Sequence, residues 1–573
     1  MRTCLLVLMV VAVTAVTLQP AAAAQENVRR LPVKEYVDRM KAAWIGQMAG
    51  VGQGAPTEFK WKGTIGPEDK MPNWTPGTIN QFGQDDLYVE MTFLRTLEQH
   101  GWDVSIRQAG IDFANSGYPL WHANVAGRTN LRKGIAPPDS GHPKFNKCAD
   151  DIDYQIESDF SGIIAPGMPN LVIALGEKFG RLMNYGDGVY GGQFFGALYA
   201  EAFFEKDPVK IAQAGLKAIP EGSQYAECIR DVLKWRQENP DDWQKTWQLI
   251  EAKYQKNPAY RRASCDKGAF NIDAKINGAY VLMGILYGKR DLDATIKIAC
   301  RCGQDSDCNP SSAAGVIFTT VGYEKLPDTY KSALDMKAKF SHTPYDFPTL
   351  IQVSEKLARD AVVKCGGRIE KNDKGEEVFV IPVQEAKPGK LEQCWEPGPI
   401  ADSKFTPEEM ARITAKDKPK GGGENSQPVD IKAAAEKFGP GWKVEKCGPD
   451  MDPGLRDEWG GKKNVLMTHP LERDVGCALS KKIAVPAGKK TVLHIVVAND
   501  PRGDFDLIVK ADGKELLKKT IKVNTEDAPN QWLTEDVDLS PMAGKEVNVE
   551  IINQPTEWSW EAAYFAEIKV ASE

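Results

Sequence analysis

The sequence lacks a surplus of positive charge. It contains 72 Lys and Arg against 79 Asp and Glu, which gives a formal net charge of −7 and a pI near 5.7. Proteins that bind nucleic acid draw on such a surplus to hold phosphates, so nucleic acid is not an expected partner. With 573 residues, of which 26% are charged and 42% hydrophobic, the chain is long enough for several domains and too apolar for a disordered protein.

Several common catalytic motifs are also missing. The sequence contains no G-x-x-x-x-G-K-[ST] phosphate loop, no H-E-x-x-H and no G-x-S-x-G. Gly50, Gly52 and Gly54 form a glycine-rich turn, but they miss the dinucleotide-binding spacing and follow a predicted helix rather than a strand. A nucleotide cofactor is therefore disfavoured.

Long apolar runs are missing except at the N-terminus. Arg2 precedes an apolar run over residues 5–18, and four alanines at 21–24 offer a small-residue cleavage site. This order is typical of a secretory signal peptide over residues 1–24. An uncleaved anchor is the alternative, but the run is shorter than the ~20 residues that span a bilayer. We expect a secreted or periplasmic protein with no membrane insertion.

The cysteine count also bears on the compartment. Of the eleven cysteines, Cys4 leaves with the signal peptide. The ten that remain are an even number, which favours disulfides in an oxidising compartment. Cys447 and Cys477 could form one of them. Cys300, Cys302 and Cys308 lie close enough in the chain to suggest zinc instead, but they lack the paired C-x₂-C spacing and no histidine lies nearby.

The first large segment has the apolar spacing of helices. Val33, Tyr36, Val37, Met40 and Trp44 keep the spacing of one buried helical face. The same spacing returns at residues 87–97, 279–286 and 313–321. No β-rich runs separate these segments, so residues 25–345 are predicted to form an all-α domain.

The character of the chain changes after residue 345. Residues 346–428 are rich in proline, glycine and charge, which indicates a linker and extension. From 429 to 573 the period becomes two, which predicts a β-sandwich of jelly-roll-like type. Strands are expected at 491–498, 505–510, 516–523, 547–552 and 564–570. Five tryptophans could stack on sugar rings or belong to the core: Trp442, Trp459, Trp532, Trp558 and Trp560.

Carboxylates stand at the predicted starts of two helices. Asp85 and Asp86 follow Gln84 before one apolar helix, and Asp305 and Asp307 precede another. Aspartate is also common at helix starts for purely structural reasons. Two adjacent carboxylates repel, however, and an Asp-x-Asp loop directs its oxygens to one point, so a hard cation such as Mg²⁺ is a natural way to neutralise them.

Glu58 follows the glycine-rich turn. Glycines allow the backbone to approach a ligand closely, so an acidic side chain at this place can reach a substrate. The alternative is an exposed loop glutamate without a role.

These segments together resemble the ADP-ribosylglycohydrolase family over about residues 33–330, in the family's order. Residues 45–59 resemble its opening helix and loop ending in a functional glutamate. Asp85 and Asp86 resemble the early metal pair, and residues 303–315 the late metal motif. The resemblance implies an all-helical fold, one or two Mg²⁺ ions held by the four aspartates and Gln84, and hydrolysis at an anomeric carbon, with Glu58 handling a proton.

A weaker match covers residues 161–166, which resemble the family's loop near the substrate. Asp151 and Asp153 lead into this loop and are the next catalytic candidates after Glu58. The resemblance implies substrate contacts from Tyr154, Glu157, Ser161 and Gly162, although a solvated loop is the alternative.

Three positions depart from the family pattern. Val51 stands where an aspartate is usual, Gln84 replaces a threonine, and Cys308 replaces a threonine or serine. Gln84 and Asn309 can still offer amide oxygens, whereas a thiol is a poor magnesium ligand.

We therefore expect a secreted, metal-dependent glycosyl hydrolase. With a signal peptide, its substrate is expected to be an extracellular N- or O-glycoside, another small molecule or a glycan rather than ADP-ribosylated protein. By analogy of architecture, the sandwich is expected to bind carbohydrate. The alternative is a catalytically inactive binding or scaffold protein that keeps the helical fold, which the departures at Gln84 and Cys308 motivate.

Overall fold

The computed structural model describes residues 27–414, 431–448, 451, 453–472, 475–525, 528–556 and 560–573. The predicted signal peptide lies outside these residues. Across the described ranges, no helix combines the length and the apolar character that a membrane span requires. The chain forms two compact units, Met1–Ala415 and Lys416–Glu573, each with its own hydrophobic core.

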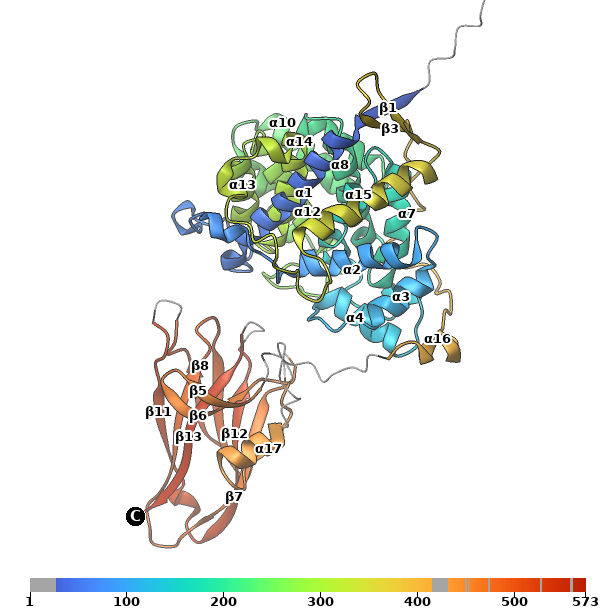
Figure 1. The fold of residues 1–573 in the computed structure, drawn as a ribbon. Helices are drawn as coiled ribbons and strands as arrows, with labels where there is room; N and C mark the ends of the chain where they lie inside the picture. The colour runs from blue at the N-terminus through green and yellow to red at the C-terminus, as the bar shows by residue number, and fades with distance from the viewer. Residues whose placement is uncertain are drawn as a thin grey trace, which may run out of the picture. The chain divides into compact units, whose positions relative to one another are not determined.

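The first unit is helical, as the spacing predicts (Figure 1). Its central contact joins α1 (Val33–Gly54) to α14 (Cys308–Val321), two helices from opposite ends of the unit's sequence. The other α-helices of its described part are α2 Asp85–His100, α3 Ile106–Ala114, α4 His122–Arg132, α5 Asp153–Ile156, α6 Asp159–Ile163, α7 Pro169–Phe179, α8 Asp187–Ala202, α9 Pro208–Leu216, α10 Gln224–Glu238, α11 Trp243–Ile250, α12 Ala274–Tyr287, α13 Leu292–Arg301, α15 Phe347–Lys364 and α16 Pro407–Ala411.

Glycines on α1 explain how closely it packs against α14. A Cβ added to Gly50 would lie 2.1 Å from the carbonyl oxygen of Pro310, and one added to Gly54 would lie 2.2 Å from that of Ser306. No side chain fits at either distance, so the two backbones touch only because both positions are glycine. The expected glycine-rich turn is therefore wrong, because residues 50–54 are the buried last turns of a helix.

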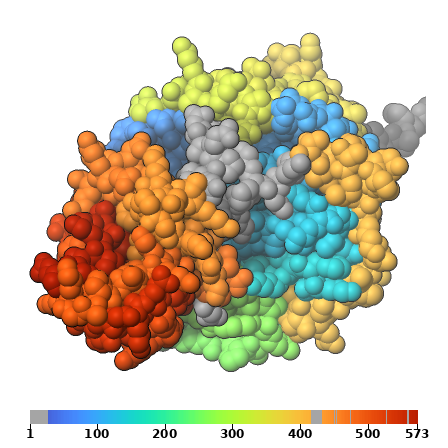
Figure 2. All heavy atoms as spheres, turned by 90° about the horizontal axis from the view of Figure 1, so that it is seen from below, coloured from blue at the N-terminus to red at the C-terminus, as the bar shows by residue number. Residues whose placement is uncertain are grey.

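The helical unit extends beyond residue 345. Helix α15 and strands β2 (Arg368–Lys371) and β3 (Glu377–Pro382) follow, and β1 (Val28–Pro32) pairs with β3 in a small antiparallel sheet. Farther on, the N–H of Ala136 donates to the carbonyl of Ser403 at 3.0 Å. Figure 2 shows this late segment in gold against the cyan surface near residue 130. Much of the stretch expected as a linker over 346–428 is thus folded, because its apolar residues have a core to join.

The second unit is the predicted β-sandwich. Its two antiparallel sheets have the strand orders β10-β9-β12-β7-β4 and β11-β8-β13-β6-β5. Leu479, Val549, Leu493 and Phe565 belong to the core shared by the two sheets. The strands are β4 Lys443–Glu445, β5 Gly454–Trp459, β6 Lys462–Thr468, β7 Cys477–Val485, β8 Thr491–Asn499, β9 Phe505–Ala511, β10 Lys514–Ile521, β11 Leu533–Asp538, β12 Lys545–Gln554 and β13 Ala563–Ser572, preceded by α17 Ile431–Phe438.

The five strands expected from sequence correspond to β8, β9, β10, β12 and β13. Cys447 lies within hydrogen-bonding reach of Cys477, but both are free thiols in the structure, so their disulfide stays a prediction.

The described tryptophans of this unit mostly pack against other side chains. Trp442 is buried and Trp459 stacks on Tyr564 with ring centroids 3.7 Å apart. The Trp532 indole donates to the Gly460 carbonyl at 2.8 Å. Trp560 is 43% exposed, and Trp558 lies outside the described residues.

Candidate active site

The two aspartate pairs meet where α2 and α14 begin. One oxygen of Asp85, one of Asp86 and the sulfur of Cys308 lie within 4.8 Å of one another, and so do one oxygen of Asp305, one of Asp307 and the same sulfur. Asp85 and Asp86 open α2, while Asp307 directly precedes α14. The close packing of α1 on α14 and the start of α2 thus brings together residues about 220 positions apart.

These carboxylates are buried and incompletely satisfied. Asp86, Asp305 and Asp307 are 1%, 3% and 4% exposed. Asp86 Oδ1, Asp86 Oδ2 and Asp307 Oδ1 are buried and have no hydrogen-bond partner of standard geometry among the described residues. Leaving such groups unpaired is costly. A bound cation would remove that cost, so this donor set fits a metal ion.

The pKa values of the site reflect the same crowding. Burial, followed by the charge of Asp85, raises the pKa of Asp86 to about 7. Burial also raises the pKa values of Asp305 and Asp307, to which the neighbouring carboxylates add. Without a cation, protons must take over part of the neutralisation.

Glu58 stands at the edge of this cluster. The residues beside it are fixed to the late aspartate loop, because the Phe59 N–H donates to the Gln304 carbonyl at 3.0 Å and the hydroxyls of Thr57 and Ser306 lie 2.8 Å apart. The surrounding protein, and then the charges of Asp307 and Asp85, raise the pKa of Glu58 above its ordinary value. Its side chain is also accessible to solvent, which weakens these effects.

Asp151, Asp153 and Glu157 form a second acidic group. The Ala123 N–H, at the start of α4, donates to both Asp151 Oδ2 and Asp153 Oδ2, at 3.0 and 2.9 Å. Burial raises the pKa of Asp153 to about 6 and that of Asp151 farther above its ordinary value. The charge of Asp153 adds to the effect of burial on Asp151, so the pKa values of the two carboxyls depend on each other.

This second group faces the first. The Asn124 amide donates to one oxygen of Glu157 at 2.8 Å, and the other oxygen has no partner among the described residues. The charge of Asp85 contributes to raising the pKa values of both Asp153 and Glu157. The structure therefore brings Asp151, Asp153 and Glu157 close to the aspartate cluster.

Three predicted substrate contacts lie in the core instead. Tyr154 is fully buried and its ring packs where side chains on Gly180 and Gly192 would otherwise be. Ser161 and Gly162 are buried in the contact of α6 with α8 at Gly196. These three residues are as buried as Glu157, and their role as substrate contacts stays a prediction.

The two amide side chains keep oxygens for a ligand. Gln84 precedes α2, and its amide nitrogen donates to Gln81 Oε1 at 2.9 Å. This hydrogen bond uses the nitrogen of the Gln84 amide and not its oxygen. The Asn309 nitrogen donates to Asn277 Oδ1 at 2.9 Å, and Asn309 Oδ1 is buried without a partner in the described part of the chain. Gln84 as a metal ligand remains a prediction.

Sequence reasoning missed Glu90 and Asp159. Both are buried, and the Glu90 carboxylate accepts the Phe160 N–H at 2.7 Å while Asp159 accepts the Tyr199 hydroxyl at 2.9 Å. Glu90 lies four residues after Asp86, on the same helical face. That spacing was the available signal.

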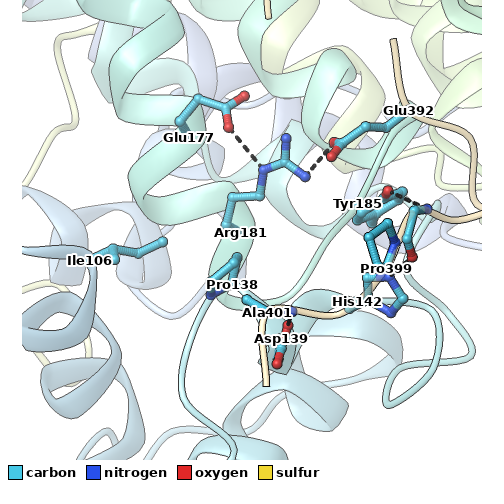
Figure 3. Close-up of a pocket in the computed structure, with 11 residues that line it drawn as sticks. Ile106, Pro138, Asp139, His142, Glu177, Arg181, Tyr185, Glu392, Pro399 and Ala401 are labelled. Atoms are coloured by element: carbon cyan, nitrogen blue, oxygen red, sulfur yellow. Dashed lines mark hydrogen bonds and ion pairs between the residues drawn. The ribbon is translucent and has the colours of Figure 1, made fainter. Parts of the chain in front are cut away.

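A cavity lies elsewhere in the helical unit. It measures about 410 Å³ and contains Arg181 between Glu177 and Glu392 (Figure 3). None of the predicted site residues lines it. Arg181 in this cavity pairs with two glutamates, and Asp139 accepts the backbone N–H groups of Ala401 and Ser403, so we place the candidate site at the aspartates.

This mainly helical unit gathers buried, incompletely satisfied carboxylates at the starts of two helices, a donor set that suits a cation. The ADP-ribosylglycohydrolase family model matches residues 32–366. The chain belongs to this family of glycohydrolases.

Two solved structures are similar to parts of the chain. An ADP-ribosylglycohydrolase-related protein complex is 16% identical, with a TM-score of 0.36, and the match covers 57% of this chain and 99% of the other. A family 35 carbohydrate binding module from Clostridium thermocellum is 13% identical, with a TM-score of 0.18, and the match covers 23% and 92%. No curated protein sequence matches.

Proposed function

We propose that this protein is a secreted or periplasmic hydrolase that depends on a divalent cation and cleaves a glycosidic bond at an anomeric carbon. The observation that carries the proposal is the meeting of Asp85 and Asp86 with Asp305 and Asp307 around buried oxygens that have no partner in the described chain. A scaffold protein has no need to bear that cost.

The four aspartates would hold the cation, with amide oxygens of Gln84 and Asn309 as further donors. Such an ion supplies Lewis-acid chemistry, since it can bind substrate hydroxyls and lower the pKa of a water. Carboxylate and amide oxygens suit Mg²⁺, which the family resemblance implies. The number of ions, one or two, belongs to this proposal.

Glu58 and the Asp151–Asp153 pair would handle protons. Glu58 is the accessible carboxyl of the site, and its raised pKa lets it carry or release a proton near neutral pH. Asp151 and Asp153 are buried, and both carboxyls accept the Ala123 N–H. We assign the direct proton transfer to Glu58 because its side chain can reach a substrate.

The substrate we propose is a small glycoside or a glycan outside the cytoplasm. This rests on the signal-peptide pattern at residues 1–24. Cleavage of an ADP-ribosyl bond is the competing substrate class within the same chemistry.

The sandwich offers one candidate contact for a glycan. Trp560 is 43% exposed, and the Arg502 guanidinium lies 3.4 Å from its ring centroid. An exposed indole with a fixed orientation can stack on a sugar ring. Loss of polysaccharide retention in Trp560→Ala, with retention kept in Trp442→Phe, would support this role.

A screen of nitrophenyl glycosides, nucleosides and ADP-ribosyl conjugates, each with Mg²⁺, with other divalent ions and with EDTA, tests the main proposal. We expect cation-dependent release of one class of product. The competing reading, an inactive scaffold, would be supported if calorimetry detects no cation bound at the aspartates and no substrate is cleaved.

A further inference from the structure

Cys308 occupies the centre of the aspartate cluster. It is the first residue of α14 and is only 4% exposed. Its sulfur lies within 4.8 Å of an oxygen of each of four carboxylates, Asp85 and Asp86 on one side and Asp305 and Asp307 on the other. No other described sulfur has this position, because the only other mixed group joins Cys148 and Cys265 to Asp151.

Several oxygens around this sulfur are buried and lack a hydrogen bond of standard geometry among the described residues. Both oxygens of Asp86, Asp307 Oδ1 and Asn309 Oδ1 are buried without a hydrogen bond of standard geometry in the part of the chain described, while the side chains of Cys308 and Ser311 lie next to the Asp86 carboxylate. These atoms point to a bound ion independently of the cysteine. Any ion that satisfies them comes next to the sulfur.

The chemistry of the donors bears on which ion that is. Magnesium prefers oxygen ligands, and a thiol beside it stays unused. Zinc, cobalt and cadmium accept sulfur together with carboxylate oxygen and gain affinity from it. A buried cysteine at the hub of the site therefore changes the preference of the whole donor set.

We propose that Cys308 is a metal ligand and makes this centre select a thiophilic divalent cation of the zinc class over magnesium. This inference rests on the proposed cation site. On binding, the sulfur–hydrogen bond breaks, the proton leaves to solvent, and the sulfur's electron pair forms the bond to the metal. No atom changes its oxidation state.

The test uses the full chain loaded with Co²⁺, whose absorption spectrum reports a thiolate ligand directly. Calorimetry then measures Zn²⁺ and Mg²⁺ affinity in wild type, Cys308→Ser and Asp305→Asn. Cys228→Ser is the control, since Cys228 is equally buried but donates to the Lys275 carbonyl, away from the aspartates. Zn²⁺ affinity alone decides nothing, because most sites bind Zn²⁺ more tightly than Mg²⁺.

We expect a thiolate-to-cobalt charge-transfer band in wild type and in Cys228→Ser but not in Cys308→Ser. Cys308→Ser should lose Zn²⁺ affinity on the order of 10²-fold and Mg²⁺ affinity much less. A wild-type cobalt complex without that band, or unchanged Zn²⁺ affinity in Cys308→Ser, overturns the inference.

Asp305→Asn separates this inference from the proposed function. If it loses all the ions while Cys308→Ser behaves as wild type, the cation site stands and only the role of the thiol fails. If Asp305→Asn binds every ion as wild type does, the site itself is elsewhere and both fail.

Discussion

Two buried acidic clusters in the helical unit differ in how their negative charge is compensated. Asp150 and Asp187 share one cation of the chain itself, since Lys275 Nζ lies 3.2 Å from Asp150 Oδ2 and 3.5 Å from Asp187 Oδ2. Lys275 is 2% exposed. Burial alone would lower its pKa, but the charges of the two aspartates raise it instead.

The cluster of Asp85, Asp86, Asp305 and Asp307 is arranged otherwise. It leaves buried oxygens unpartnered within the described residues and collects further carboxyls around them. A lysine fixes a structure permanently, whereas a site that must bind something leaves its charges for a ligand. This difference supports placing the proposed cation at the cluster of Asp85, Asp86, Asp305 and Asp307, where no cation of the described chain takes the place that Lys275 has in the other cluster.

The largest effect should come from Asp305→Asn, which keeps the shape of the side chain but removes its charge. We expect hydrolysis to fall by about 10³-fold, because a bound cation contributes several kcal/mol to transition-state stabilisation, and we expect cation-induced thermal stabilisation to disappear. Activity assays and thermal melts with and without the ion measure this. Asp328→Asn, whose side chain is 92% exposed, is the control, and an equal loss there would remove the special role of Asp305.

Glu58→Gln removes the ionisable proton while it keeps hydrogen bonding. Turnover should fall by about 10²–10⁴-fold with little change in substrate binding, if Glu58 transfers the proton. Steady-state kinetics on the cation-dependent substrate give both values, with Glu68→Gln, an exposed glutamate, as the control. Wild-type turnover in Glu58→Gln would move the role to Asp151 and Asp153.

Lys275→Met tests the paired cluster. Two buried carboxylates would lose their cation, so the free energy of unfolding should drop by about 3–5 kcal/mol. Urea denaturation followed by circular dichroism measures the change. Lys297→Met removes a lysine from an exposed pair with Asp293 and should change stability by at most about 0.5 kcal/mol. Similar losses in both variants would contradict the comparison.

Gly50→Ala tests the helix contact that assembles the cation site. The added Cβ would meet the Pro310 carbonyl at 2.1 Å, so we expect a loss of about 1–3 kcal/mol in stability together with weaker cation binding. Gly77→Ala has no atom within 4 Å of its added Cβ and is the matched control. If Gly50→Ala is destabilised but binds the cation with unchanged affinity, the contact of α1 with α14 does not assemble the cation site.

The smallest effect is a pH dependence. Folding raises the pKa of Asp86 from 3.8 to about 7, so the folded state binds more protons in that window. The resulting contribution to stability is full at low pH and is lost as the pH rises through about 7. In EDTA, the melting temperature of wild type relative to Asp86→Asn should therefore fall across this window, and added cation should reverse the fall. A relative rise would show the opposite sign.

Local patterns determined much of this protein. Helical spacing of apolar residues, aspartates at helix starts and the two-residue period of the strands all act over a few residues, so the helical unit, the strands β8, β9, β10, β12 and β13, and the positions of Asp85, Asp86, Asp305 and Asp307 follow from sequence alone. The family resemblance added Glu58. None of these features needs a contact between distant parts of the chain.

Tertiary structure decided what those residues can do. Only the backbone contact of Gly50 and Gly54 with α14 brings Glu58 to the late aspartates. Tertiary packing buries Tyr154 in the core and places Glu157 close to the aspartates. It also places Cys308 between the Asp85–Asp86 pair and the Asp305–Asp307 pair. The physical reason is that burial and proximity depend on which helix faces pack together in the fold. The residues next to a position in the sequence do not determine those contacts.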